Sequence, residues 1–150
     1  MNINFERHMM KLSNYFVVLV FALVTSLFSV ASFAQTVSSG VLQPAFSSWG
    51  KKSVVGSWQI VEEEGQHFIV LGDDFSAKEG PDVKVFLSPK PANEIEGSNA
   101  TDGSLYVTQI TRFKGQYRIA IPKTATLDEY QSLVFHCEEF SKLWGTSALR

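Results

Sequence analysis

The residue best suited to chemistry in this 150-residue chain is its only cysteine, Cys137, within LVFHCEEF. A thiol can ligate a soft metal, form a mixed disulfide with a partner or be oxidised to a sulfenic acid. These reactions need a stabilised thiolate, and the carboxylates of Glu138 and Glu139 disfavour one. The ring of His136 precedes the thiol and is the candidate helper. With no second cysteine, an internal disulfide cannot form.

A metal site in this chain has few ligands to draw on. Beyond residue 34, histidine occurs only at His67 and His136, and methionine does not occur. With Cys137 these residues would give two imidazoles and a thiolate, as in a copper site, but without the axial methionine. There is no CxxCH motif for covalent haem attachment. His67, His136 and Cys137 are therefore the metal-ligand candidates, and a haem or another metal would have to come through a partner.

Other sequence patterns give little support for catalysis. Residues 72–82, GDDFSAKEGPD, gather acidic side chains around a Gly-Pro turn. Calcium could bind such oxygen ligands, but the spacing matches no EF-hand, and Asx turns in a solvated loop are the simpler interpretation. No GxSxG motif occurs, and nothing pairs a serine with His67 or His136. We expect no autonomous catalytic activity.

Strand periodicity decides where the thiol points. Residues 132–137, SLVFHC, form a short apolar run. Because side chains alternate across a strand, Leu133, Phe135 and Cys137 share one face and His136 lies on the other. Leucine and phenylalanine indicate the core side, so Cys137 is predicted to point inward, as buried free cysteines do. A structural thiol and a reactive one both remain open, since a bulge could bring the ring and the sulfur together.

Seven short strands separated by turn-rich links account for most of the chain, and no segment has a convincing helical period. The pattern predicts an all-β fold, an antiparallel β-sandwich of about seven to eight strands. Residues 35–46 are expected to be a leader that could add an edge strand, and residues 47–150 the domain. The predicted strands are 53–63, 67–71, 83–88, 104–110, 115–121, 132–137 and 142–149.

Residues 1–34 have the layout of a secretory signal peptide. A basic start is followed by an uncharged apolar run, 15–34, that ends in the small-x-small triplet Ser32-Phe33-Ala34. Cleavage between Ala34 and Gln35 would make the protein secreted or periplasmic, without a membrane attachment. The alternative is an N-terminal membrane anchor, because the run is just long enough to span a bilayer.

The charge balance narrows the class of partner. The formal net charge is −2, with both signs mixed along the chain. This balance gives no electrostatic footprint for nucleic acid or for an anionic membrane surface. A nucleic-acid partner is therefore not expected.

Three fragments occur in an order that resembles the DM-thirteen domain family, also called the electron-transfer DM domain. They are DFSAKEGPDVKVFLS, GQYRIAIP and DEYQSLVFHCEEFSKLWGTSAL, and the resemblance runs from about residue 47 to residue 149. Two positions depart from the family pattern: His136 replaces an aromatic residue, and Trp144-Gly145 replaces Phe-Gly. The matching positions are Asp74, Phe75, Gly80, Pro81, Asp82, Gly115, Tyr117, Ile121, Pro122, Tyr130, Ser132, Cys137, Phe140, Gly145 and Ala148.

The resemblance implies an exported electron-transfer accessory domain centred on Cys137, with a redox or haem-binding protein as its partner. It also implies that the loop carrying Asp74, Gly80, Pro81 and Asp82 belongs to the same site. A lone thiol transfers electrons only with a bound ligand, through a mixed disulfide or as a sulfenic acid. The alternative function is a non-catalytic secreted β-sandwich that binds a partner through its loops and keeps Cys137 as a structural residue.

Overall fold

A computed structural model describes residues 33–45 and 54–150, which belong to one compact unit, Phe33–Arg150. Nearly all of the predicted signal peptide, residues 1–32, lies outside the described residues. Within the described ranges no helix is both long enough and apolar enough to cross a membrane. The regular structure there is strands with three short 3₁₀ turns, so the all-β prediction is confirmed.

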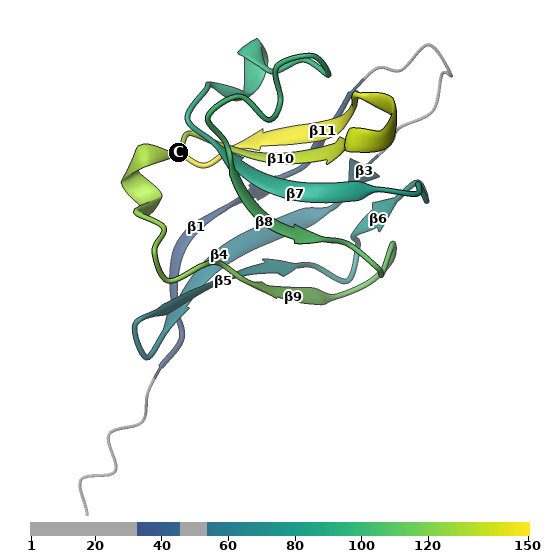
Figure 1. The fold of residues 1–150 in the computed structure, drawn as a ribbon. Helices are drawn as coiled ribbons and strands as arrows, with labels where there is room; N and C mark the ends of the chain where they lie inside the picture. The colour runs from purple at the N-terminus through teal and green to yellow at the C-terminus, as the bar shows by residue number, and fades with distance from the viewer. Residues whose placement is uncertain (1–32, 46–53) are drawn as a thin grey trace, which may run out of the picture. The chain divides into compact units, whose positions relative to one another are not determined.

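The first sheet is antiparallel and has the order β1-β4-β5-β9 (Figure 1). The loop of its β4–β5 hairpin consists of Glu64 and Gly65. Both residues have positive φ, which is the conformation typical of a two-residue hairpin loop. The segment expected as a leader supplies its edge strand β1. The strands are β1 (Gln35–Val41), β4 (Ser57–Glu63), β5 (Gln66–Leu71) and β9 (Tyr117–Ala120).

The second sheet carries the cysteine and has the antiparallel order β2-β11-β10-β7-β8. A two-stranded pair, β3 with β6, lies beside the sheets (Figure 1). The 3₁₀ turns are η2 (Ala92–Glu94), η3 (Leu127–Glu129) and η4 (Glu138–Phe140). The strands are β2 (Gln43–Pro44), β3 (Val54–Val55), β6 (Ser76–Ala77), β7 (Val83–Ser88), β8 (Leu105–Gln109), β10 (Ser132–Cys137) and β11 (Lys142–Ala148).

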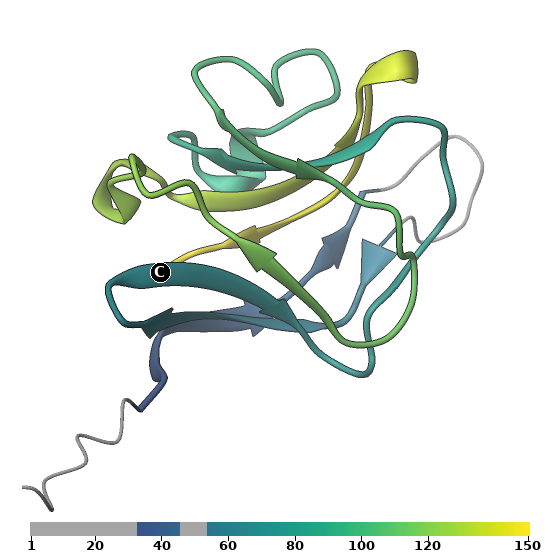
Figure 2. The same ribbon diagram turned by 60° about the horizontal axis from the view of Figure 1, so that its bottom comes forward.

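The main core fills the space between the two sheets, which Figure 2 shows as two layers. Its buried residues include alternate positions of β4, β5, β7 and β10, as the alternation predicted. In β9, Ile119 is buried whereas Arg118 and Ala120 are exposed. Phe75, from the loop before β6, packs on Phe135 of β10 with ring centroids 5.9 Å apart. Apolar burial of this kind is the principal force that holds such a domain together.

The outer face of the second sheet is also covered. The segment 89–104, between β7 and β8, lies over β10 and β11 on the side away from the first sheet (Figures 1 and 2). We call this segment the cover. Its Ile95 and Ala100 bury Phe86 and Val134 in a second, smaller cluster. Every residue of β10 is consequently buried, from both sides.

Candidate functional site

Cys137 is the last residue of β10, and it is a free thiol with 0% of its surface exposed. It belongs to the main core together with Leu133 and Phe135, which confirms the predicted inward orientation. Its cross-strand partners are Val83 on β7 and Lys142 on β11, the final pairs of both ladders at that end. The sulfur therefore lies in apolar surroundings at the end of the sheet.

The turn that follows the thiol is exposed to solvent. Residues 138–142 are all exposed, and the ring of Phe140, at its tip, has 52% of its surface exposed. Ser141 closes η4 in the left-handed region, at φ 49° and ψ 45°, and its N–H donates to the carbonyl oxygen of Glu138 at 3.0 Å. The exposed fraction thus rises from 0% at Cys137 to 39% for the side chain of Glu138, and the exposed turn begins one residue after the thiol.

The loop that contains Gly80, Pro81 and Asp82, which we call the GPD loop, contacts this turn. The N–H of Glu138 donates to the carbonyl oxygen of Asp82 at 3.1 Å. Lys84 Nζ contacts Asp82 Oδ2 at 3.1 Å and also forms an ion pair with Glu138 Oε2. The bonds to Glu138, and then to Asp82, raise the pKa of Lys84 above its ordinary value. We call these contacts the clamp; the structure brings Asp82 and Cys137 to the same end of the β7–β10 pair.

Gly80, which precedes Pro81 in this loop, packs against Trp144, the aromatic residue that departs from the family pattern. A Cβ on Gly80 would lie 3.1 Å from Trp144 Cζ2 and 2.8 Å from Val83 Cγ2. The indole Nε1–H donates to the carbonyl oxygen of Lys78 at 2.9 Å. Strand pairing skips Trp144, so this bulge on β11 directs the indole into the main core. These contacts fix the path of the loop beside the thiol end.

Asp74 belongs to a different set of contacts. Its carboxylate accepts from the Ser57 N–H at 2.9 and 3.0 Å and from the Ser57 hydroxyl at 2.6 Å. The hydroxyl bond first, and the backbone bond second, lower the pKa of Asp74 below its ordinary value. Asp74 braces the loop against β4 and sets Phe75 into the core, so its observed partners are structural.

His136 lies on the face of β10 opposite to the thiol, as alternation predicted. The ring is 3% exposed and sits edge-on to Phe86, with centroids 6.4 Å apart. Its Nε2 is 2.9 Å from the carbonyl oxygen of Gly97 in the cover, whereas Nδ1 is buried without a hydrogen-bond partner in the described part of the chain. The bulge on β11 leaves His136 and Cys137 on opposite sides, so the ring does not act on the sulfur directly.

The three metal-ligand candidates are not brought together. His67 is on β5 in the first sheet, where its Nε2 lies 3.9 Å from Glu62 Oε2. Across residues 33–45 and 54–150, no group of three or more His, Cys, Asp or Glu side chains is arranged to hold a metal ion. The arrangement favours thiol chemistry at Cys137 over a ligand set built from these three residues.

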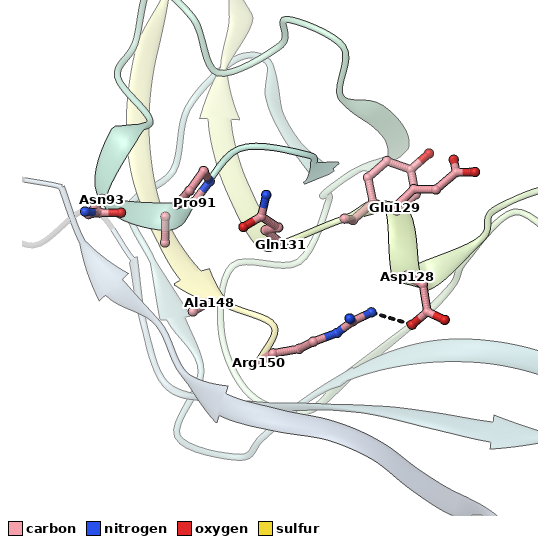
Figure 3. A pocket seen from close by; sticks show the side chains of 9 residues that line it. Pro91, Asn93, Asp128, Glu129, Gln131, Ala148 and Arg150 are labelled. Atoms are coloured by element: carbon pink, nitrogen blue, oxygen red, sulfur yellow. Dashed lines mark hydrogen bonds and ion pairs between the residues drawn. The ribbon is translucent and has the colours of Figure 1, made fainter.

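Two surface hollows flank β10. One, of about 580 Å³, is lined by residues of η2, η3 and the end of β11, and the ion pair between Arg150 and Asp128 crosses it (Figure 3). It lies at the Ser132 end of the strand, away from the thiol. The other, of about 800 Å³, is bounded by Gly97 of the cover and by Ser141 and Leu143, next to the turn.

The cover is the part of the site that sequence reasoning missed. The sequence of the cover predicts only a long turn-rich link. In the structure, Asn99 stabilises it: its Oδ1 accepts from the Glu96 N–H at 2.9 Å and its Nδ2 donates to the carbonyl oxygen of Glu94 at 3.1 Å. The sequence did contain an indication of the cover, because Phe86 and Val134 are apolar residues on the strand faces opposite the main core. Such residues need a covering segment.

Comparison with family models gives a match over most of the chain. The model of the family described as "Electron transfer DM13" matches residues 45–149. No curated protein sequence and no solved structure matches the chain.

Proposed function

Because this chain belongs to the electron transfer DM13 family, we propose that it is an exported redox accessory domain that acts through Cys137. The observation that carries this proposal is the position of the thiol, fully buried at the end of the core yet directly before an exposed turn. The thiol is thereby shielded from indiscriminate oxidation, and opening one turn makes it accessible. Such local opening costs less free energy than global unfolding.

The chemistry that suits a lone thiol is thiol–disulfide exchange with another protein. After the turn opens, the Cys137 thiolate attacks one sulfur of a partner disulfide. A new sulfur–sulfur bond forms, the partner's bond breaks, and its second sulfur leaves as a thiolate that takes up a proton. A thiolate of a dithiol donor protein then attacks the Cys137 sulfur and the partner leaves with both of its sulfurs reduced. The donor's second thiolate displaces Cys137 as a thiolate and closes the donor's own disulfide, so two electrons pass from the donor to the partner without a resident cofactor. The partner class is a redox or haem-binding protein.

Export is part of the proposal and rests on residues 1–34. The basic start, apolar run and small-x-small triplet favour a cleaved signal peptide. Cleavage after Ala34 would leave Gln35 as the first residue of the mature chain, and Gln35 is also the first residue of β1. An oxidising compartment outside the cytosol is where exposed thiols meet disulfides.

The experiment is to incubate the folded mature protein with glutathione disulfide and to follow the gain of one glutathionyl group by mass spectrometry. We expect modification of Cys137 at a rate well above the rate of global unfolding, measured separately in denaturant and extrapolated to water. If modification proceeds no faster than global unfolding, the thiol has no route of its own to solvent and the redox proposal fails.

A second candidate function is a binding module in which Cys137 is only a packing residue. The observation that favours it is the complete burial of the sulfur among apolar residues, where free cysteine behaves as a small hydrophobe. The same experiment separates the two functions. Protection of Cys137 up to global unfolding would support the binding module.

A further inference from the structure

The cleavage site expected after the signal peptide lies directly before the first strand of the domain. Cleavage between Ala34 and Gln35 leaves Gln35 as the amino-terminal residue, and Gln35 is also the first residue of β1. Phe33 and Ala34 precede the strand without belonging to it, and both are exposed, Phe33 with 84% of its surface. The peptide bond to be cut therefore lies in exposed chain at the border of the fold, where a peptidase can reach it.

A glutamine at the amino terminus carries a nucleophile and an electrophile in one residue. Its α-amine reaches the side-chain Cδ by closing a five-membered ring, the size that forms most readily. An α-amino group titrates near pH 8, so part of it is the unprotonated nucleophile at neutral pH. The side chain of Gln35 can fold back onto the amine, because it is exposed and forms no hydrogen bond with the described residues.

We propose that Gln35 is a modification site at which the mature amino terminus closes to pyroglutamate. The inference rests on the export part of the proposed function and is independent of the chemistry of Cys137. The unprotonated α-nitrogen attacks Cδ, and the new N–Cδ bond closes a lactam. The Cδ–Nε2 bond breaks, and the departing nitrogen takes up the proton that the α-nitrogen loses and leaves as ammonia. The step needs no oxidant, reductant or cofactor.

The start of β1 accommodates the ring. Gln35 pairs with Glu62 on β4, whose carboxylate lies beside His67, with 3.9 Å between Glu62 Oε2 and His67 Nε2. A free α-ammonium would add a positive charge at this place, whereas the lactam is neutral. The first three residues of β1 are exposed, so closing the ring displaces no side chain from the core.

The modification has a consequence for the fold because β1 is an edge strand of the first sheet. None of its seven residues is buried, and its contacts are backbone pairing with β4 and serine hydroxyl bonds such as that of Ser38 to the carbonyl oxygen of Leu149. A strand held in this way frays at its free end. An aminopeptidase, which needs a free α-amine, can then remove β1 residue by residue and leave the edge of β4 unpaired. A pyroglutamyl end has no such amine and protects the strand.

The test uses the full chain, with residues 1–34 included, expressed in a bacterial host. The protein found outside the cytoplasm is purified, and its intact mass and amino-terminal sequence are measured. The expected mass is that of residues 35–150 less one ammonia, and stepwise sequencing should find the terminus blocked. Pyroglutamyl peptidase should then remove one residue and expose Thr36.

The matched control is Gln35→Asn, which keeps an amide but would have to close a strained four-membered ring. Its mature chain should carry the full mass and give asparagine in the first sequencing cycle. Aminopeptidase should leave the wild type intact and shorten Gln35→Asn within β1, and equal resistance of the two proteins would overturn the protective role. If Gln35→Asn is not processed, Gln35→Glu takes its place, because a carboxylate is a far poorer electrophile than an amide.

The outcomes separate this modification from the redox proposal. A mature chain that begins at Gln35 and keeps a free amine after incubation at pH 8 overturns the modification and leaves export standing. A chain that retains residues 1–34, or begins at another residue, overturns the modification together with the expected cleavage. A blocked terminus in a protein whose Cys137 never reacts with glutathione disulfide supports the modification and sinks the redox chemistry alone.

Discussion

His136 and Cys137 are consecutive residues whose side chains are separated by the sheet itself. The sulfur lies in the core between the sheets, and the imidazole lies under the cover, in contact with Gly97. Both are at least 97% buried, so β10 ends with a thiol and an imidazole that are covered on opposite faces of the sheet. The two groups do not contact each other directly, and the contact of Gly97 with Ser141 joins the cover to the turn that follows the thiol.

The first prediction concerns the packing of the sulfur. Cys137→Ala removes a buried atom and leaves a small cavity, which should lower the free energy of unfolding by about 1–2 kcal/mol. Cys137→Ser keeps the volume but buries a hydroxyl in apolar surroundings, which should cost about 1–3 kcal/mol more than an apolar replacement of similar size. Denaturant unfolding of the three proteins checks the order wild type, Ala, Ser. A serine variant as stable as the alanine variant would mean that the sulfur has polar surroundings.

The second prediction tests the loop that sets Phe75 into the core. Gly56 has φ 126°, and a Cβ there would lie 2.6 Å from the Phe75 Cα, so Gly56→Ala should destabilise the fold by about 3 kcal/mol or more. Gly65→Ala is the matched control, because φ is 73° but no atom lies within 4 Å of the added Cβ. It should cost only about 1 kcal/mol, from backbone strain alone. Thermal or denaturant unfolding compares them, and equal losses would refute the close contact at Gly56.

Two strands were predicted from the sequence to the residue, whereas the predicted strand 115–121 is shorter in the structure, as β9 at Tyr117–Ala120. The ranges 83–88 and 132–137 match β7 and β10, because Val, Leu and Phe on the core face leave one register. The sequence did not predict the bounds of β1, β2, β3 and β6, because these strands are short or exposed. In β1, QTVSSGV has no apolar alternation, and it joins the sheet through backbone pairing with β4.

The site could be predicted only where it depends on the local chain. Alternation alone placed Cys137 inward and His136 outward. The clamp joins residues 82 and 84 to residue 138, and the cover joins residue 97 to residues 136 and 141, so each depends on contacts far apart in sequence. The cover also has no periodicity of its own, because it is built from turns around Asn99 with Ile95 and Ala100 as its buried residues.

The third prediction follows from the lowered pKa of Asp74. A carboxyl whose pKa is lower in the folded state than its ordinary value of 3.8 stabilises the fold above that value. This contribution is lost as the pH falls below 3.8 and through the folded pKa. The urea midpoint should therefore fall between pH 4.5 and pH 2.5 more steeply in the wild type than in Asp74→Asn, which cannot ionise. Parallel profiles would show that the bonds from Ser57 do not favour the carboxylate.

The fourth prediction concerns the clamp as a barrier to thiol access. Lys84→Met keeps the apolar stem and removes the charge that holds Asp82 and Glu138 together, so the turn 138–141 should open more often and labelling of Cys137 at pH 7.5 should accelerate several-fold. The raised pKa of Lys84 gives the corresponding pH effect in the wild type. The contribution of the clamp is present below about 10.5 and is lost as the pH rises through the folded pKa above that value.

The control for the clamp is Arg118→Met. It removes a more exposed ion pair on the first sheet, where Arg118 contacts Glu63 at 2.5 Å and neither residue belongs to the turn. Labelling of Cys137 should be unchanged in this variant, and high salt should accelerate labelling of the wild type but not of Lys84→Met, because screening weakens exposed ion pairs. Equal labelling rates in Lys84→Met and the wild type would mean that the packing of Val83 and Trp144, rather than the clamp, protects the thiol. The opening that exposes Cys137 would then begin within the core instead of at its solvated end.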